Sequence, residues 1–392
     1  MQSNYEVKLN NIPVGPLGLI PHKSSAQLGK DVDSYLSSWR KARMDEGVIP
    51  DAFAEYQKDS YIIKASTPRF GSGEAKAVIH ESVRGDDIFI LLDVINYSLT
   101  YSLSGAMNHM SPDDYFQDLK RLIAAVSGKA RRITVIMPYL YESRQDMRCG
   151  RESLDCALAL QELARMGVEN FITFDAHEPK VQNAIPLKSF ENVSCIYQFI
   201  KALLRTETNL TIDKDHMTVI SPDEGGTARA IHCANYLGVD MGMFYKRRDY
   251  TRIVDGKNPI VSHEYLGTDL ENQDVIIIDD MISSGDSILD VARELKRRKA
   301  RKVFAVATFG LFTAGLAKFD EAYEKGVIDR VLTTNLIYQT PDLLSRPYYV
   351  SVDLSKYIAL LIDHLNHNVS IHDLLSPTAR INKLLEEYKQ NQ

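Results

Sequence analysis

Short apolar strand patterns alternate with amphipathic helix patterns along most of this chain. The first clear series predicts a helix over 115–126, a strand over 133–137, a helix over 154–166 and a strand over 171–174. A second series starts near residue 217 and predicts strands over 217–220, 275–278 and 303–308. Strands that alternate with helices of about 10–15 residues pair in parallel, because each helix returns the chain to the same end of the sheet. The predicted fold is therefore α/β, with two doubly wound parallel-sheet domains.

Length and composition are those of a soluble globular protein. The 392 residues have room for two domains, and the apolar fraction is 44% with 25% charged residues. A net charge of −6 argues against nucleic acid as the main partner. The four cysteines show no CxxC spacing, which excludes the usual zinc patterns. Without a signal-peptide pattern or a run of about 20 apolar residues, we expect a cytoplasmic protein that does not enter a membrane.

The stretch VIIIDDMISSGDSI, residues 275–288, carries the clearest sign of a ligand site. It predicts a buried strand, two acids, a small-residue turn and then a helix. A turn at a helix N-terminus presents backbone N–H groups to an anion. Asp279 and Asp280 follow the strand and could accept hydrogen bonds from sugar hydroxyls or approach a metal. Together these features indicate a phosphorylated sugar, although the same pattern also occurs where such residues only cap a helix.

Three further segments fall where a parallel sheet places its ligands, after the carboxyl ends of strands. SPDEGG, residues 221–226, opens a helix and holds Asp223, which could bind a hard cation. His177 directly follows the strand over 171–174; it is either a site residue or a satisfied polar one. The cationic segment over 245–252 is either a solvated hairpin or a mobile loop that brings Lys246 and Arg248 onto phosphate charge.

Several ordered motifs resemble those of ribose-phosphate pyrophosphokinases. They run from residue 69 to about 375 and comprise RFGSGE, SVRGDDIFI, PYLYESRQD, FITFDAH, SPDEGG, YKRR, the 275–288 stretch and ATFGLF through VLTTNLI. The 275–288 stretch alone is similar to the phosphoribosyl-pyrophosphate fingerprint of phosphoribosyltransferases, but those enzymes do not explain RFGSGE, RQD or FDAH. The resemblance implies domains of phosphoribosyltransferase type. It also implies transfer of the diphosphoryl group of Mg·ATP to the 1-hydroxyl of ribose 5-phosphate, giving phosphoribosyl pyrophosphate and AMP for nucleotide biosynthesis.

The resemblance assigns roles by position. Lys246 matches the catalytic lysine, and Arg248 matches an arginine that contacts substrate and stabilises the transition state. His177 and Asp223 match ligands of Mg²⁺, the expected cofactor. The implied ATP-binding residues are Phe70, Ser72, Glu74, Arg144, Gln145, Asp146 and His177. The implied ribose 5-phosphate residues are Arg248, Asp279, Asp280, Ser283, Ser284, Gly285, Asp286 and Ser287.

Some positions depart from the family's usual residues. Ser283 and Ser72 stand where Asp is usual, Ser284 and Ser287 where Thr is usual, Asp286 where Gly is usual, and Phe309 where His is usual. The serines keep hydroxyl donors for a phosphate. Asp286 instead places a negative side chain near that phosphate unless it points outward. These departures keep a second hypothesis open, a non-catalytic regulatory homologue, against which the retained charged residues argue.

The resemblance also implies a domain plan and partners. The predicted ranges are an ATP-binding domain over 1–208 with an insertion near 39–60, a phosphoribosyltransferase-like domain over 209–360, and a helical tail over 361–392 that packs on the first domain. ATP is expected at the domain junction, with Phe70 and Glu74 reaching the adenine of a neighbouring subunit. The implied assembly is a homo-oligomer, usually a hexamer built from dimers.

Overall fold

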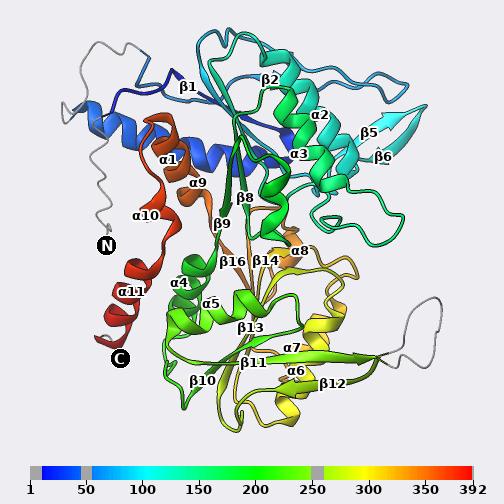
Figure 1. The fold of residues 1–392 in the computed structure, drawn as a ribbon, viewed down its shortest axis with the longest axis vertical. Coiled ribbons are helices and arrows are strands. Elements are labelled where there is room, and N and C mark those ends of the chain that lie inside the picture. The colour runs from blue at the N-terminus through cyan, green and yellow to red at the C-terminus, as the bar shows by residue number, and fades with distance from the viewer. Residues whose placement is uncertain (1–10, 46–54, 249–259, 391–392) are drawn as a thin grey trace. The chain divides into compact units, whose positions relative to one another are not determined.

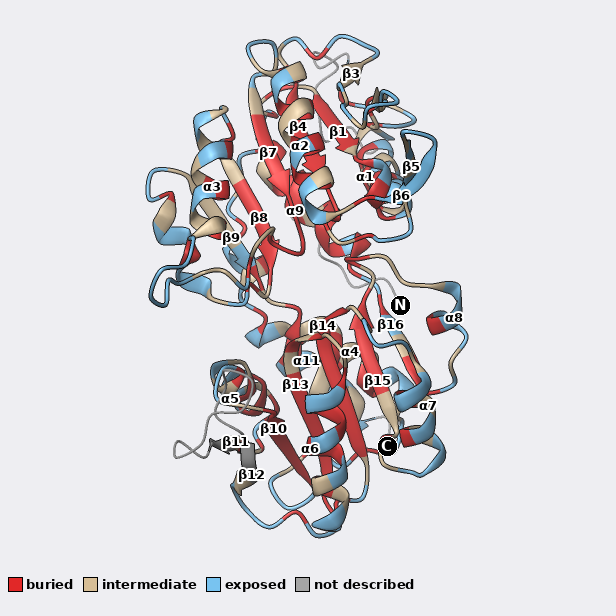
Figure 2. Cartoon of the chain, turned by 90° about the vertical axis from the view of Figure 1, so that its right-hand side faces the viewer, coloured by how far each residue is buried: buried red, intermediate tan, exposed pale blue. Residues whose placement is uncertain are grey.

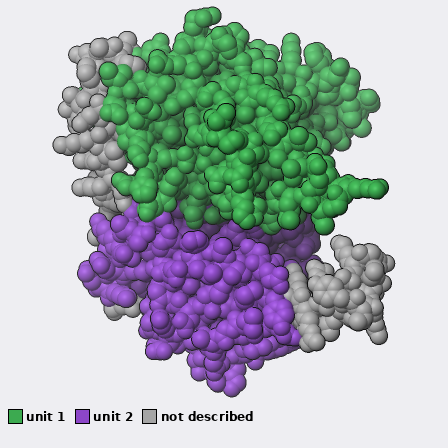
Figure 3. Space-filling view, viewed as in Figure 1, with its two compact units in different colours: residues 1–194, 335–338, 353–376 green, residues 195–334, 339–352, 377–392 purple. Residues whose placement is uncertain are grey.

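The structure, a computed structural model, describes residues 11–45, 55–248 and 260–390. The chain forms two compact units, coloured separately in Figure 3. Unit 1 comprises 1–194, 335–338 and 353–376, and unit 2 comprises 195–334, 339–352 and 377–392. The units do not follow the three predicted ranges, because residues 195–208 belong to unit 2 and the predicted tail is divided after residue 376. None of the described helices is long and apolar enough to cross a membrane.

Unit 1 is built on a five-stranded sheet in the order β1-β4-β7-β8-β9, whose strands are labelled in Figure 2. Figure 1 colours the chain from its N-terminus to its C-terminus. All four strand pairs are parallel. The strands are β1 (Leu17–Pro21), β4 (Asp87–Leu91), β7 (Arg132–Ile136), β8 (Asn170–Phe174) and β9 (Ser189–Val193). The helices are α1 (Ala26–Asp45), α2 (Pro112–Val126), α3 (Asp155–Arg165), α9 (Ser355–Asn366) and α10 (His372–Leu375). The predicted parallel α/β architecture is thus confirmed for this unit.

Local sequence explains where these elements begin. Every residue of β4 is buried, as expected for an apolar strand covered on both faces of a parallel sheet (Figure 2). Helix α2 begins with a capping box: the Ser111 hydroxyl accepts from the Asp114 N–H at 3.1 Å, and the Asp114 carboxylate accepts from the Ser111 N–H at 2.9 Å. Pro112 occupies the first turn, where no N–H partner is needed.

A buried polar network joins α1 to α9. The Arg40 guanidinium donates to Asp363 Oδ1 at 3.1 Å and to Asn366 Oδ1 at 2.7 Å. Asn366 in turn donates to Asp87 Oδ2 at 2.9 Å, at the start of β4. Asp363 and Asn366 come from the returning segment 353–376, so residues more than 300 positions apart in the chain complete one another's hydrogen bonds. The first part of the predicted insertion near 39–60 therefore forms the end of α1, a helix that packs within unit 1.

Two small sheets flank the main sheet of unit 1. β2 (Ala65–Ser66) pairs with β3 (Val78–Ile79), and β5 (Thr100–Leu103) pairs with β6 (Ala106–His109). Ala75, Ala77 and Ile79 alternate along the sequence, but of these residues only Ile79 lies in β3. The β5–β6 hairpin was not predicted, because its alternating residues are mostly polar and exposed.

Unit 2 is built on a seven-stranded sheet in the order β12-β11-β10-β13-β14-β15-β16. The strands are β10 (Met217–Ser221), β11 (Asp240–Arg248), β12 (Ile260–Leu266), β13 (Asp274–Ile282), β14 (Val303–Gly310), β15 (Arg330–Thr334) and β16 (Tyr349–Val352). Only the β11–β12 pair is antiparallel among these described strands. The helices are α4 (Ile196–Thr206), α5 (Thr227–Leu237), α6 (Asp286–Arg297), α7 (Ala317–Glu324), α8 (Pro341–Leu344) and α11 (Thr378–Gln390). Helix α11 packs on α4 and α5 of this unit.

The direction of winding differs between the two sheets. In unit 1 the strand order follows the chain order. In unit 2 the chain runs outward from β10 through β11 to β12, returns to β13 on the other side of β10, and continues outward to β16. The change of direction that defines a doubly wound sheet therefore lies between β10 and β13. Ligands of open α/β sheets bind at this kind of switch point, outside the carboxyl ends of the strands.

Candidate functional site

The switch point of unit 2 brings three predicted site segments to one edge of the sheet. Parallel pairing aligns Ile220 of β10 with Ile277 of β13, so the loop over 221–226 begins beside Asp279 and Asp280. The sequence predicted that the strand ends before these acids, but both lie within β13, which continues to Ile282. β11 pairs in parallel on the other side of β10, with Met243 opposite Ser221. Residues 244–248 of β11 therefore run on past the same edge.

The segment Tyr245–Arg248 forms a strand, whereas one of the two interpretations of the sequence was a mobile loop. It pairs with β12, with Lys246 opposite His263 and Arg248 opposite Ile260, and a register shift lies between Arg247 and Arg248. Residues 249–252 of the predicted cationic loop lie outside the described residues. For Lys246 and Arg248 the structure describes the backbone alone.

The two acids of β13 differ in their surroundings. Asp280 is buried, and its N–H donates to Asp279 Oδ1 at 2.8 Å. Arg229, on the first turn of α5, places Nη1 3.7 Å from Asp279 Oδ1. Burial is the largest cause that raises the pKa of Asp279, to about 7, and the neighbouring Asp280 adds to it while Arg229 opposes it. Asp279 is thus poised to change its charge near neutral pH when a cation or a hydroxyl arrives.

Gly285 sets the shape of the loop that follows β13. Its φ is +88°, a left-handed conformation that favours glycine. A Cβ atom built on it would lie 2.3 Å from Cε2 of Phe319, a buried residue of α7. The backbone at Gly285 is therefore held against α7, directly before α6 begins at Asp286. Since the first N–H groups of a helix have no intrahelical partner, this fixed turn presents donors suited to a phosphate.

Asp286 is exposed and carries two contacts of its own. Ser284 Oγ donates to Asp286 Oδ2 at 3.0 Å, and Lys318 Nζ of α7 donates to Asp286 Oδ1 at 2.5 Å. The hydrogen bond from Lys318 holds the pKa of Asp286 below its ordinary value, so the carboxylate is ionised at neutral pH. The negative charge that the sequence places in this loop is thus paired with a cation.

The loop after β10 is closed by its own side chains. Ser221 Oγ donates to the carbonyl of Asp223 at 2.6 Å, and the Gly226 N–H donates to Asp223 Oδ1 at 3.2 Å. A Cβ on Gly226 would lie 2.8 Å from Ser221 Oγ, so the backbone needs glycine there. Asp223 thus closes its own loop with one carboxylate oxygen directly before α5 begins.

Unit 1 presents the predicted ATP-binding residues on separate segments. Phe70 is 53% exposed on a turn closed by its N–H, which donates to the Glu74 carbonyl at 2.7 Å. Within this turn Ser72 Oγ donates to Glu74 Oε2 at 2.9 Å. The preceding Arg69 anchors the turn through Asp118 of α2 at 3.0 Å. The turn therefore offers an aromatic face and a carboxylate to solvent from a fixed base.

The other predicted residues follow the adjacent strands β7 and β8. Arg144 is exposed, and Gln145 Nε2 donates to the carbonyls of Met147 and Ser153 at 3.2 and 2.8 Å. Asp146 is half-buried beside them. Beyond β8, Asp175 has a φ of +38°, and His177 is exposed. His177 belongs to unit 1 and Asp223 to unit 2, so the two implied metal ligands lie on different units.

Among the residues that the structure describes, no group of three or more His, Cys, Asp and Glu side chains is arranged to hold a metal ion. In proteins Mg²⁺ is usually bound through one or two carboxylates together with substrate phosphates. The carboxylate oxygens of Asp223 and Asp279 are of the kind that Mg²⁺ prefers, so their chemistry fits this ion.

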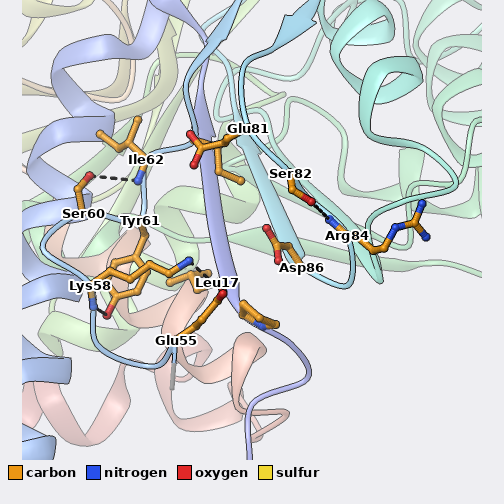
Figure 4. A pocket seen from close by; sticks show the side chains of 12 residues that line it. Leu17, Glu55, Lys58, Ser60, Tyr61, Ile62, Glu81, Ser82, Arg84 and Asp86 are labelled. Carbon is orange, nitrogen blue, oxygen red and sulfur yellow. Dashed lines mark hydrogen bonds and ion pairs between the residues drawn. The ribbon is translucent and has the colours of Figure 1, made fainter. Parts of the chain in front are cut away.

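One cavity of about 320 Å³ lies in unit 1, away from every predicted site residue. Its lining includes Glu55, Lys58, Glu81, Arg84 and Asp86 (Figure 4). Lys58 pairs with Glu55 at 3.3 Å, and the Glu81 carboxylate accepts from the Lys64 N–H at 2.8 Å. The charged groups of this cavity are largely engaged with the protein itself.

Neither Arg229 nor Lys318 was predicted from the sequence to belong to the site. Each acts on a predicted residue from a different element, Arg229 from α5 onto Asp279 and Lys318 from α7 onto Asp286. The position of Arg229, two residues after the start of a helix that opens on a predicted loop, was a usable signal. For Lys318 the chain offered no such signal, because it lies 31 positions after Ser287 and no spacing in the sequence relates it to the loop over 283–287.

The two units match known domain families in chain order. Residues 17–167 match the family described as the N-terminal domain of ribose phosphate pyrophosphokinase. Residues 189–346 match the phosphoribosyl transferase domain. In the solved structure of phosphoribosylpyrophosphate synthetase from Mycobacterium smegmatis, 99% of that chain aligns with 90% of this one, with a TM-score of 0.70 and 22% identity, which shows a shared fold.

Curated relatives agree with this assignment over most of their length. The ribose-phosphate pyrophosphokinase of Buchnera aphidicola subsp. Schizaphis graminum is 30% identical over 311 residues, which is 78% of this chain and 89% of the relative. That of Vibrio parahaemolyticus is 28% identical over 313 residues, with the same coverage. The fold and the loops at its switch point define an α/β protein of the phosphoribosyltransferase class, with an added N-terminal unit. The chain belongs to the ribose-phosphate pyrophosphokinase family.

Proposed function

We propose that this chain transfers the diphosphoryl group of Mg·ATP to the 1-hydroxyl of ribose 5-phosphate. The 1-hydroxyl oxygen bonds to the β-phosphorus, the bond from that phosphorus to the oxygen of the α-phosphate breaks, AMP leaves, and the hydroxyl proton is released. The products are phosphoribosyl pyrophosphate and AMP. The observation that carries the proposal is the switch point of unit 2, where the loop after β10 begins beside the two acids of β13.

The loop over 283–287 is proposed to hold the 5-phosphate. Gly285 keeps the turn in the left-handed conformation against Phe319, and backbone N–H groups at the start of α6 donate to the phosphate oxygens. The hydroxyls of Ser283, Ser284 and Ser287 add donors where the family usually has Asp or Thr. A phosphate bound there places the ribose over the end of β13.

Asp279 and Asp280 are proposed to orient the ribose. Ionised carboxylates accept hydrogen bonds from sugar hydroxyls, and this fixes the ring so that its 1-hydroxyl faces the incoming phosphorus. Arg229 favours the ionised form of Asp279, because it is the cation nearest to that carboxylate among the described groups. Binding of the substrate and the ionisation of Asp279 are thereby linked.

Lys246 and Arg248 are proposed to stabilise the charge that develops on the transferred group. β11 carries them past the carboxyl edge of the sheet, next to β10. Phosphoryl transfer depends on positioned cations more than on covalent participation of the protein. Arg248 is also proposed to contact ribose 5-phosphate.

Magnesium and ATP complete the proposed site. Asp223 and His177 would hold Mg²⁺ together with the nucleotide phosphates, where the ion neutralises phosphate charge when bound. Phe70, Ser72, Glu74, Arg144, Gln145 and Asp146 are proposed to bind ATP, with Phe70 offering its exposed ring to an adenine. Self-association into a homo-oligomer and a cytoplasmic location complete the proposal.

Release of AMP from Mg·ATP, measured with and without ribose 5-phosphate, tests the reaction. We expect AMP only in the presence of the sugar phosphate, with phosphoribosyl pyrophosphate formed in equal amount by ³¹P NMR. Ribose without the 5-phosphate serves as the matched control and should give no product. Nucleotide binding without any AMP release would contradict the proposal and favour a non-catalytic regulatory homologue.

A further inference from the structure

The loop over 283–287 is already engaged with an anion supplied by the protein itself. The Asp286 carboxylate accepts from Ser284 Oγ at 3.0 Å through one oxygen and from Lys318 Nζ at 2.5 Å through the other. Hydroxyl and ammonium groups are the donors that phosphate sites use. Asp286 therefore engages two groups suited to a phosphate at the same helix N-terminus.

Lys318 is held close to this loop by the packing of its neighbour. Phe319 is fully buried, and its ring lies against Gly285, where an added Cβ would approach Cε2 to 2.3 Å. Phe319 also packs edge-on against Phe312, with ring centroids 5.2 Å apart. Since these contacts fix the first turn of α7, the Lys318 ammonium can reach the loop without any movement of the backbone.

The Lys318–Asp286 pair is exposed, so it can be broken easily. The Lys318 and Asp286 side chains are 49% and 55% exposed, so both can turn away from each other at little cost. A phosphate carries more negative charge than a carboxylate and offers more acceptor oxygens. In competition for the same ammonium, a phosphate held by the helix N-terminus is the stronger partner.

We propose that Lys318 is a further ribose 5-phosphate-binding residue, and that Asp286 holds it and Ser284 in place until the 5-phosphate displaces the carboxylate. The inference rests on the proposed function, because it takes the loop over 283–287 as the 5-phosphate site. On binding, Lys318 Nζ and Ser284 Oγ exchange Asp286 for phosphate oxygens, and the Asp286 side chain turns to solvent. The cation thus compensates for an acid at a position where the family usually has glycine.

The test is a double-mutant cycle in which the dissociation constant of ribose 5-phosphate is measured by calorimetry on the full chain. Asp286→Asn removes the competing charge and should tighten binding by about 3-fold. Lys318→Met should weaken binding by about 10-fold. In the Asp286→Asn background, where no carboxylate competes for the ammonium, it should weaken binding by at least the same factor. Raised ionic strength should shrink each effect, since both groups are exposed.

Lys325→Met is the matched control. Lys325 directly follows α7 and, like Lys318, forms an exposed ion pair, in its case with Glu321. It lies at the opposite end of this helix from Lys318 and Phe319. Its loss should leave ribose 5-phosphate affinity unchanged. If Lys318→Met had no effect in the Asp286→Asn background, Lys318 would serve only to neutralise Asp286, and the inference would be overturned. A wild-type chain that binds no ribose 5-phosphate would overturn the proposed function itself.

Discussion

Arg229 Nη1 of α5 lies 3.7 Å from Asp279 Oδ1 of β13, so a cation faces the first acid of the proposed ribose site. Asp280 is the next residue along the strand, and it donates its own N–H to the same carboxylate at 2.8 Å. Burial and the second carboxylate raise the pKa of Asp279 to about 7 against the opposing effect of Arg229. Through the protonation of Asp279, both the stability of the protein and the proposed binding of substrate therefore depend on pH.

The stability of the protein should reflect the raised pKa of Asp279. Because the folded-state pKa of about 7 exceeds the ordinary value of 3.8, protonated Asp279 stabilises the folded state. This stabilisation is complete below pH 3.8 and is lost as pH rises to about 7. For one proton the slope is at most about 1.4 kcal/mol per pH unit. Urea denaturation should therefore show that Asp279→Asn gains stability relative to wild type as pH rises from about 5 to about 8. A difference that stays constant with pH would show that Asp279 is ionised throughout.

Removal of Arg229 should shift the pH dependence of activity. Arg229→Met takes away the cation that favours ionised Asp279, so we expect the pH profile of kcat/KM to move to higher pH. The loss should be about 10-fold near pH 7 and should partly recover near pH 8.5. Arg229→Lys keeps the charge and should restore most of the activity at pH 7. An equal loss at every pH would assign Arg229 a role that does not act through Asp279.

Gly285→Ala should both destabilise the fold and weaken phosphate binding. The substitution forces a Cβ into the Phe319 ring and places alanine at a φ of +88°. We expect a loss of about 2 kcal/mol or more in the free energy of unfolding. Gly326→Ala is the control, since Gly326 has a φ of +64° and its added Cβ meets nothing within 4 Å. Equal losses in thermal unfolding for the two variants would mean that contact with Phe319 is unimportant.

Lys246→Ala should lower kcat by about 100-fold or more with little change in ribose 5-phosphate affinity. The reason is that a cation aimed at the transferred group acts chiefly on charge that develops in the transition state. Steady-state rates and calorimetric affinities on the same preparation separate the two effects. Near-normal turnover would remove Lys246 from the proposed mechanism.

Periodicity in the sequence was sufficient to predict the elements that form the two sheets. The strand predicted over 171–174 is β8 (Asn170–Phe174), and the helix over 154–166 is α3 (Asp155–Arg165). These elements are predictable because burial of an apolar face leaves a local repeat. The sequence left the segment over 245–248 open between a hairpin and a mobile loop, because charged residues on an edge hairpin carry no such repeat. Its pairing with β12 depends on residues farther along the chain.

The same distinction applies to the proposed site. Asp279, Asp280 and Gly285 lie on one strand–loop–helix segment, so their grouping could be predicted from spacing alone. Arg229 and Lys318 reach that segment from α5 and α7, and side-chain pairs of this kind depend on how elements pack in space. The switch point between β10 and β13 likewise follows from strand order, which the sequence does not state.

The buried network around Arg40 bears on the order in which the chain matures during synthesis. Arg40 emerges from the ribosome more than 300 residues before Asp363, the carboxylate that pairs with it in the finished core. A buried guanidinium without its counter-ion is strongly unfavourable, so α1 cannot settle into its final environment while α9 is still untranslated. The first unit must wait for almost the whole of the second to be translated, and a nascent chain halted before residue 353 should need protection by a chaperone.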